Sequence, residues 1–443
     1  MGNPAQPAQS QAAANTTEIF TGVTCPGCGL LCDDLVVERQ ADASIAIKEN
    51  GCPRSIEFFS QAAYELPSPR IAGKETDLAS AISEVASLLQ NARQPLIGGL
   101  ATEVHGMRGI LEIADLSGAT LDHMNSEAVM RNVLAMQNSG WHISTLTEVR
   151  NRADLVLVIG GDIVSRFPRF FERNIWNRES MFGQDTAARD IIYLGGPQID
   201  TAAGISPKGI KPTVLPCDNR NLPEVIAALL ALASGKALHA KEISGVAVAD
   251  LQTLAQRLAT ATYGVIVWAA ADLDFPHAEL TVQKIGELVE WFNKTTRMSG
   301  LPLAGSDGDI TANQVSAWIS GFPVRNSFKR SHPEYDPYRF SINRQLSTSE
   351  ADMLVWINTF YPERLPPETD LPTVVIGHPS MKLTSEPDVF IPVGIPGIDH
   401  AGIMFRSDTV VSLPLSKLRQ TQLPSLGEVL AGIKAKLGGH ASC

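Results

Sequence analysis

The chain has 443 residues, of which 44% are hydrophobic and 19% are charged, a balance typical of a globular protein with two or three domains. This balance excludes a single small module and a wholly disordered chain. Acidic residues outnumber basic ones by 47 to 36, and the net charge of −11 has the wrong sign for binding nucleic acid or an anionic membrane through bulk charge.

The N-terminal residues do not resemble a targeting signal. Residues 1–16 are rich in Ala and Gln, and they contain neither the basic nor the apolar region of a secretory signal. The longest apolar runs, at 153–164 and 225–233, are shorter than the ~18–20 residues that span a bilayer. We therefore expect a disordered tail at 1–16 on a cytoplasmic protein that binds neither membrane nor nucleic acid.

A small cysteine-bearing unit is predicted for residues 17–65. Apolar stretches at 35–37 and 45–47 flank a polar turn, a pattern typical of a two-stranded hairpin. Beyond this unit, apolar residues recur at helical spacing between residues 78 and 89. The change of pattern predicts that a different domain begins near residue 66.

Short apolar runs alternate with helical segments along the rest of the chain. The runs are PLIGGLA (95–101), ADLVLVIGG (153–161), DIIYLGG (190–196), GVIVWAA (264–270), MLVWIN (353–358) and TVVIGH (373–378). Helical periodicity is clearest at 222–232 and 276–293. The alternation predicts an α/β fold with doubly wound parallel sheets, whose ligands lie beyond the carboxyl ends of the strands. The segments 300–308 and 326–343 are predicted to be loops.

The predicted domain boundaries follow this alternation. We expect one α/β domain at 66–220, a second at 221–380, and a C-terminal segment at 381–443 that packs back on the core.

Four cysteines form the most specific motif in the sequence. Cys25, Cys28 and Cys32 are separated by two and three residues, and Cys52 follows after nineteen more. Three thiolates from a tight loop and a fourth from a distant segment are the arrangement that holds an iron–sulfur cluster or a tetrahedral zinc ion. We favour a cluster because zinc ribbons usually have two C-x2-C knuckles. The alternative is a group of buried structural cysteines, which is also our interpretation of the isolated Cys217.

Two other groups of residues could belong to a site. His105 follows a predicted strand, but a solvated loop histidine is the simpler interpretation. Arg166, Arg169 and Arg173 form a basic and aromatic segment that could contact an anionic cofactor or a partner. On an acidic protein, we expect these arginines to be salt-bridged or to lie at an interface.

Several separated motifs resemble the B subunit of formylmethanofuran dehydrogenase. They are TCPGCGLLCDDL (24–35) with NGC (50–52), TLTEVRNRADLVLVIGGD (145–162), NQVSAWISGFPV (313–324) and DVFIPVGIPGIDHAGIMFRSD (388–408). The resemblance runs in order from about residue 21 to 415 and implies the fold of the molybdenum- and tungsten-pterin oxidoreductases. This family also includes a subunit of the bacterial formyltransferase/hydrolase complex, which handles formyl groups on tetrahydromethanopterin and a furan cofactor.

The sequence departs from the redox-active members at two places. The resemblance implies a Cys-His pair before 145–162, but the corresponding stretch, 125–131, is NSEAVMR. His123 lies just upstream, although an imidazole is not the soft thiolate expected there. An Asp-Pro-Arg element would fall at 194–201, where LGGPQIDT contains no arginine. We therefore expect molybdopterin and tungstopterin to be absent, whereas the intact cysteines leave a 4Fe-4S cluster open.

These observations favour a non-catalytic B-type subunit of a formyltransferase/hydrolase complex, which holds the other subunits of that complex in place. One alternative is an active metal-pterin oxidoreductase that interconverts carbon dioxide or formate with a formyl amine. Another is an iron–sulfur protein that carries electrons through Cys25, Cys28, Cys32 and Cys52.

Overall fold

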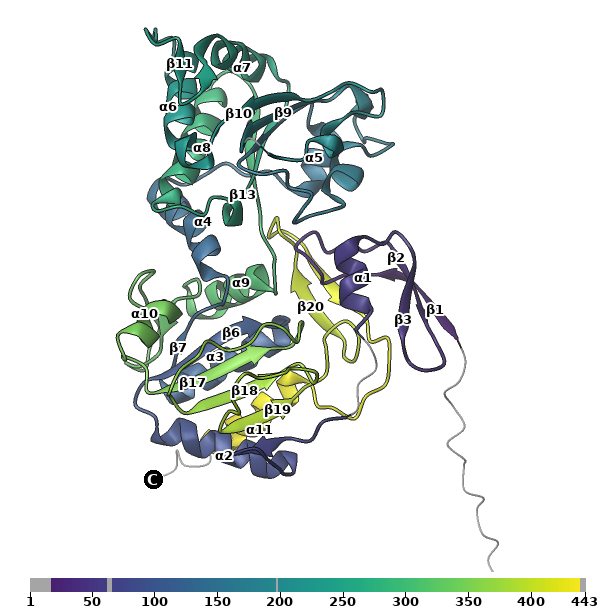
Figure 1. The fold of residues 1–443 in the computed structure, drawn as a ribbon, viewed down its shortest axis with the longest axis vertical. Helices are drawn as coiled ribbons and strands as arrows, with labels where there is room; N and C mark the ends of the chain where they lie inside the picture. The colour runs from purple at the N-terminus through teal and green to yellow at the C-terminus, as the bar shows by residue number, and fades with distance from the viewer. Residues whose placement is uncertain (1–16, 62–65, 197, 439–443) are drawn as a thin grey trace, which may run out of the picture.

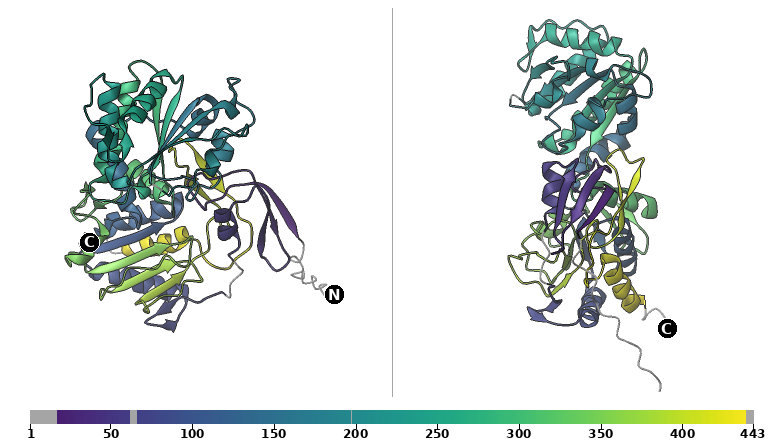
Figure 2. Two further views of the ribbon diagram at one scale, coloured as in Figure 1. Left: turned by 45° about the horizontal axis from the view of Figure 1, so that its top comes forward. Right: turned by 90° about the vertical axis from the view of Figure 1, so that its right-hand side faces the viewer.

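The computed structural model describes residues 17–61, 66–196 and 198–438, so the tail predicted at 1–16 lies outside the described residues. The chain forms two lobes, with the N-terminal unit beside their junction (Figure 1). A side view shows the lobes stacked along the long axis and the N-terminal unit at the waist (Figure 2).

The N-terminal unit is a three-stranded antiparallel sheet followed by a short helix. Its elements are β1 (Glu18–Val23), β2 (Leu35–Arg39), β3 (Ile45–Glu49) and α1 (Pro53–Phe59). Strands β2 and β3 pair with Val37 opposite Ile47, which confirms the predicted hairpin. Strand β1 was not predicted, because most of its side chains are exposed and its sequence has no clear apolar alternation.

The lower lobe is built on a nine-stranded sheet. In spatial order its strands are β16 (Glu334–Tyr335), β15 (Asn326–Ser327), β7 (Thr120–Leu121), β6 (Pro95–Ala101), β17 (Met353–Asn358), β18 (Thr373–Gly377), β19 (Val389–Pro392), β4 (Arg70–Ile71) and β5 (Lys74–Glu75). The five strands from β7 to β19 are parallel, and the edge strands are antiparallel. Strands β6 and β17 are buried along their whole length, as continuous apolar runs in a covered parallel sheet should be.

Helices cover this sheet. They are α2 (Leu78–Asn91), α3 (Val104–Ser117), α9 (Asp309–Ser320), α10 (Ile342–Ser347) and α11 (Leu426–Gly438). Asp77 caps the N-terminus of α2: its carboxylate accepts a hydrogen bond from the Ser80 N–H. The apolar face of α2 is buried. Helix α11 packs against α2 and α3, so the C-terminal segment returns to the core of this lobe. The hairpin of β20 (Gly402–Phe405) and β21 (Ser412–Leu415) runs toward the lobe junction (Figure 1).

The upper lobe contains a five-stranded parallel sheet. Its spatial order is β10 (Thr213–Pro216), β9 (Asp190–Gly195), β8 (Leu155–Ile159), β13 (Gly264–Ala269) and β14 (Met298–Leu303). Its helices are α4 (Ser126–Ser139), α5 (Leu146–Arg152), α6 (Leu222–Ala233), α7 (Val248–Thr260) and α8 (Ala278–Phe292), with a small hairpin of β11 (Glu242–Ile243) and β12 (Val246–Ala247). Short helical turns are η1 (Phe171–Ile175), η2 (Thr186–Ala188), η3 (Ala202–Gly204), η4 (Asn219–Asn221) and η5 (Ala270–Asp272).

The α/β class and the predicted apolar strands are confirmed, but the sheets divide the chain differently from the predicted domains. The strands of 155–303 form the upper sheet, which is inserted between parts of the lower lobe. Strands β17 and β18, predicted to belong with 221–380, instead lie in the sheet of β6: β17 pairs with β6, and β18 pairs with β17. The predicted loop at 300–308 is wrong in its first half, which is the end of β14. Within the described ranges, no helix combines the length and apolar character needed to cross a bilayer.

Candidate functional site

The cysteine loop lies at the junction of the lobes. Cys25 donates its N–H to the Cys32 carbonyl at 2.8 Å, which closes the loop. The Gly27 N–H points to the Cys25 sulfur at 3.3 Å. Cys52 caps α1, and the Ser55 hydroxyl accepts a hydrogen bond from its N–H at 2.8 Å. The sequence-predicted cysteines are therefore presented by one tight loop and one helix start.

Gly29 lets the cysteine loop pack closely against the chain that returns from the upper lobe. A Cβ atom at Gly29 would lie 1.9 Å from the Ala304 carbonyl oxygen, so no side chain fits there. Gly305 has a φ of +107°, and a Cβ there would lie 2.3 Å from the Gly29 Cα. The Gly29 carbonyl accepts a hydrogen bond from the Ser407 N–H at 2.8 Å. The loop is thus wedged between backbone segments that join the lobes.

The cysteine side chains share one low-dielectric environment. Cys25, Cys28 and Cys32 are buried, and Cys52 is partly buried; none of the four forms a disulfide. Burial raises the pKa of the Cys25 thiol, and the nearby Cys28, Cys32 and Cys52 raise it further. Burial also raises the pKa of Cys28 to about 12. A cationic metal centre is what would stabilise four thiolates in such a place.

Two buried polar groups, one from Arg54 and one from Tyr361, are unpaired among the described residues. The buried Nε of Arg54 has no hydrogen-bond partner within the described part of the chain, and neither has the hydroxyl of Tyr361. The charge of Arg54 slightly lowers the pKa of Cys28 against the larger effect of burial, which raises it. Burial and the nearby Cys25 raise the pKa of Tyr361. Buried polar groups without a partner are uncommon in folded proteins.

Among residues 17–61, 66–196 and 198–438, no three Cys, His, Asp or Glu side chains are placed to share one ion.

The arginines of the upper lobe are salt-bridged, as expected from the acidic character of the chain. Arg166 contacts Asp272 at 2.5 Å. Arg169 and Arg173 both donate to Asp34 Oδ1, each at 2.7 Å. The sequence could not show that Asp34, two residues after the last cysteine of the loop, is their partner.

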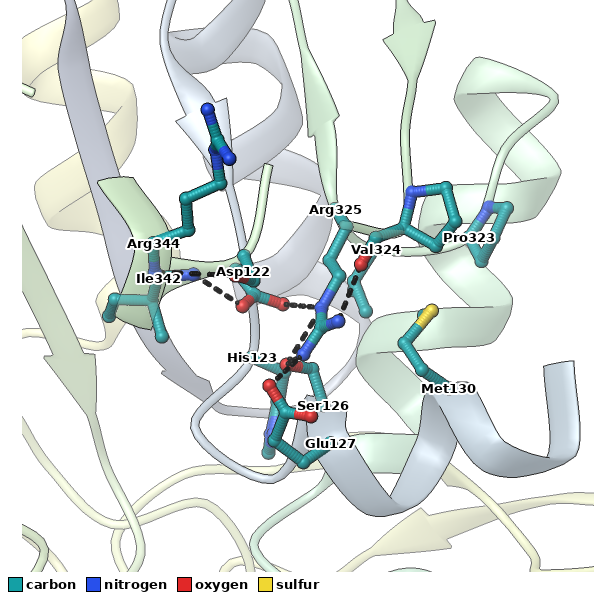
Figure 3. A network of polar contacts seen from close by, with 12 residues as sticks. Asp122, His123, Ser126, Glu127, Met130, Pro323, Val324, Arg325, Ile342 and Arg344 are labelled. Carbon is teal, nitrogen blue, oxygen red and sulfur yellow. Dashed lines mark hydrogen bonds and ion pairs between the residues drawn. The ribbon is translucent and has the colours of Figure 1, made fainter. Parts of the chain in front are cut away.

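A second polar site lies where the resemblance places the missing Cys-His pair (Figure 3). The stretch 125–131 is the start of α4, and Ser126 and Glu127 lie in its first turn. Arg325 donates to Glu127 Oε1 at 2.6 Å and to Ser126 Oγ at 3.0 Å, and it lies 3.5 Å from Asp122 Oδ1. The other Asp122 oxygen accepts from the Ile342 N–H at 2.8 Å. A buried guanidinium therefore ties α4 to the lower lobe, and no thiolate is present in the network.

His123 is buried beside this network and is fully engaged. Its Nδ1 accepts a hydrogen bond from the Asn125 N–H at 2.9 Å. Its Nε2 therefore carries the proton and donates it to the Asp307 carbonyl at 3.2 Å. Burial lowers the pKa of His123 to about 4, so the ring is neutral at pH 7. Because both nitrogens are used, His123 cannot replace the missing thiolate without breaking these bonds.

Two buried carboxylates, Asp307 beside His123 and the nearby Asp309, were missed by sequence reasoning. Asp307 pairs with Arg364 at 3.1 Å and accepts from the Asn125 amide at 3.0 Å. Burial and the charge of Asp307 raise the pKa of Asp309 to about 7. The Asp309 Oδ1 is buried without a hydrogen-bond partner in the described segments. Their only sequence signal was the SDGD run in a segment that we predicted to be a loop.

The remaining sequence candidates are structural. Cys217 is buried, and this burial raises its pKa to about 11, so the interpretation as a small apolar residue is confirmed. His105 is exposed as expected, but it lies in the first turn of α3 rather than in a loop. The segment 194–201 begins with the last two residues of β9 and contains no arginine; its residue 197 lies outside the described residues.

Comparisons with known proteins find relatives of the kind that the sequence motifs resemble. No family model matches the chain. The B subunit of tungsten-containing formylmethanofuran dehydrogenase 2 from Methanocaldococcus jannaschii is 26% identical over 407 residues, which cover 89% of this chain and 92% of that protein. The B subunit of the formyltransferase/hydrolase complex Fhc from Methylorubrum extorquens is 28% identical over 375 residues, which cover 83% of this chain and 96% of that protein.

Solved structures show the same relationship. A chain of the formyltransferase/hydrolase complex FhcABCD from Methylorubrum extorquens, solved with methylofuran, superposes with a TM-score of 0.70 and 28% identity, covering 84% of this chain and 98% of that one. Acetylene hydratase from Pelobacter acetylenicus superposes with a TM-score of 0.61 and 10% identity, covering 95% of this chain and 69% of that one. At that identity, the second match describes the fold alone.

Proposed function

We propose that this chain, a homologue of the B subunits of formylmethanofuran dehydrogenase and of the Fhc complex, is itself the B subunit of a formyltransferase/hydrolase complex. The complex would act in tetrahydromethanopterin-linked one-carbon metabolism, where formyl groups pass between carrier-specific sites. In this proposal, the chain holds the other subunits in place and performs no chemistry on the formyl group itself.

The network of Arg325 carries the non-catalytic part of the proposal. At the position where the resemblance implies a thiolate ligand and a catalytic neighbour, the chain has Ser126 and Glu127 bound to a buried guanidinium. Asp122 completes this network on the side of the lower lobe. A cation in this place repels a metal ion, and its partners lack the soft sulfur that a molybdenum or tungsten centre needs. These residues do not fit a metal-pterin centre, so we derive no redox step through one.

We further propose that the cysteine pocket holds a 4Fe-4S cluster. Cys25, Cys28, Cys32 and Cys52 would supply the four thiolates, and the unpaired Nε of Arg54 supports an anionic group next to them. A bound cluster supplies one-electron chemistry and fixes its protein ligands in space. Since the pterin site is replaced, we assign the pocket a structural role at the lobe junction.

Purification from the native organism tests the proposed function. A tag on this chain should recover three other subunit types in constant ratio through size-exclusion chromatography, identified by mass spectrometry. The recovered complex should transfer and hydrolyse formyl groups, and the isolated chain should do neither. A stable monomer without partners would contradict the proposal.

The alternative, an active metal-pterin oxidoreductase, makes a different prediction for the same sample. The complex would then reduce an artificial electron acceptor in the presence of formate or a formyl amine. The chemistry of the Arg325 network argues against that outcome.

A further inference from the structure

The upper lobe has a polar cleft at the amino ends of β13 and β14. Its volume is about 540 Å³, and its lining includes Tyr263, just before β13, and Met298, the first residue of β14. The carboxyl end of β14 leads to Ala304 and the cysteine loop. Because β14 has six residues, its two ends lie about 20 Å apart. The cleft is therefore separate from the cysteine loop and from the Arg325 network.

Arg152, the last residue of α5, is held in a fixed plane at this cleft. Its guanidinium carbon lies 4.6 Å from the centre of the Phe182 ring. A guanidinium stacked on a ring keeps the N–H groups at its edge available for a bidentate acceptor. In the described part of the chain, no carboxylate pairs with Arg152. Its donors are thus oriented and lack an acceptor.

Arg297 brings a second guanidinium to the same cleft. The Gly264 N–H donates to the Arg297 carbonyl at 2.9 Å, and the Asn293 side chain accepts from the Met298 N–H at 3.2 Å. These bonds fix the backbone on both sides of the Arg297 side chain, which also has no carboxylate partner among the described residues. Two like charges in one cleft repel each other, and an anion bound between them would remove that repulsion.

The acidic groups nearby do not neutralise these two cations. Glu148 lines the cleft with one negative charge, so positive charge remains in excess. The Asp154 carboxylate is used by the strand start, where it accepts from the Thr262 N–H at 2.7 Å and the Tyr263 N–H at 2.9 Å. An excess of guanidinium charge on a chain of net charge −11 favours an anionic ligand here rather than a cation.

Aromatic side chains give the cleft an apolar wall. Trp141 and Tyr263 are half-buried and line it. The Tyr263 hydroxyl lies 3.2 Å from Ser144 Oγ, which fixes the direction of its ring. Such walls bind the planar apolar part of a ligand, while a few charged groups orient it.

We propose that this cleft binds a small organic anion, whose carboxylate or phosphate group accepts hydrogen bonds from Arg152 and Arg297 and whose planar part lies against Trp141 and Tyr263. The inference goes beyond the proposed function, which assigns no ligand to this chain. Guanidinium groups bind carboxylates and phosphates in the same bidentate manner, so the two sources share one chemistry. The experiment below distinguishes them.

The test is a calorimetric titration of the full chain at low salt with phenyl phosphate and with benzoate. We expect at least one of them to bind, more tightly than inorganic phosphate, and we expect phenol, which lacks the charge, not to bind. The tighter of the two anions identifies the oxyanion that the cleft takes. Arg152→Gln and Arg297→Gln should each weaken binding by about 10-fold, because each removes a charge-assisted pair of hydrogen bonds. Glu148→Gln should strengthen it, because a negative charge leaves the cleft.

Arg150→Gln is the matched control. Arg150 is exposed on the same helix but does not line the cleft, so this variant changes the net charge equally and should leave binding unchanged. Thermal unfolding checks that every variant is folded. The proposal is overturned if neither aromatic anion binds at millimolar concentration, or if Arg150→Gln weakens binding as much as Arg152→Gln. Neither result affects recovery of the other subunits with the tagged chain, so the proposed function is tested separately.

Discussion

At the scale of single residues, the junction contains buried charges that are unevenly compensated. Arg325 has partners on three sides, whereas Asp309 has a neighbouring carboxylate and an unpaired oxygen. His123 avoids the cost of a buried charge by remaining neutral between two backbone groups. Stability should therefore depend on pH and on the integrity of the Arg325 network.

Asp309 should destabilise the fold as the pH rises. Its folded-state pKa of about 7 exceeds its ordinary value of 3.8, so the native state retains a proton that the unfolded chain releases. The free energy of unfolding is therefore not reduced by Asp309 below pH 3.8, and it falls as the pH rises toward 7. Relative to the unmodified chain, Asp309→Asn should gain up to ~4 kcal/mol of unfolding free energy between pH 4 and pH 8. Urea unfolding at several pH values measures this difference. The exposed control Asp250→Asn should show no such trend, and parallel curves for Asp309→Asn would disprove the assignment.

Arg325 should contribute several kcal/mol to the free energy of unfolding at alkaline pH. Asp122 is fully buried, and burial raises its pKa to about 6, so it is ionised at pH 8. Arg325→Met removes its cation, and the free energy of unfolding at pH 8 should fall by ~3–5 kcal/mol. At pH 5 Asp122 takes up a proton, so the loss should shrink. Adding Asp122→Asn should restore part of the stability at pH 8. The surface control Arg330→Met breaks only the ion pair with Glu334 and should cost at most ~1 kcal/mol. Equal losses in the two single variants would contradict this account.

At the scale of elements, the sequence predicts local secondary structure but not contacts between segments that are distant in the chain. The strands β6, β8, β9, β13, β17 and β18 were predicted because each is a continuous apolar run. Strand β14 was missed because Gly300 and Pro302 within it resemble loop residues. The pairing of Arg325 with Ser126 spans 199 positions, and no local pattern encodes such a contact. The cysteine motif was recognisable because its spacing is local.

A substitution at Gly29 tests how closely the cysteine loop packs against the chain that returns from the upper lobe. Gly29→Ala introduces a methyl group 1.9 Å from the Ala304 carbonyl oxygen, so the loop or the returning chain must move. We expect a loss of ~1–3 kcal/mol or more in unfolding free energy, measured by thermal and urea unfolding. Gly286→Ala, in α8, would meet only the Gly140 carbonyl oxygen at 3.9 Å, an ordinary contact, and should be neutral or stabilise by up to ~1 kcal/mol. A fully stable Gly29→Ala variant would show that the junction is looser than described.

At the scale of the whole molecule, the fold resembles that of acetylene hydratase. The lobe junction contains the salt-bridge network of Arg325. The superposition with acetylene hydratase covers 95% of the chain, so the scaffold is shared with that enzyme. The start of α4 nevertheless carries a salt-bridge network, and its residues are not those of a metal centre. The cysteine unit remains wedged at the waist (Figure 2). We propose that this fold, with the Arg325 network at the start of α4, serves a subunit that organises its neighbours.

Elemental analysis of the purified native complex tests this central claim most directly. Mass spectrometry of metals, scaled to the amount of this chain, should give molybdenum and tungsten far below one atom per chain, even when the growth medium supplies both. Iron content reports separately on the cysteine pocket and does not bear on the claim. Stoichiometric tungsten or molybdenum that stays with the chain would contradict the account and indicate a working metal-pterin centre.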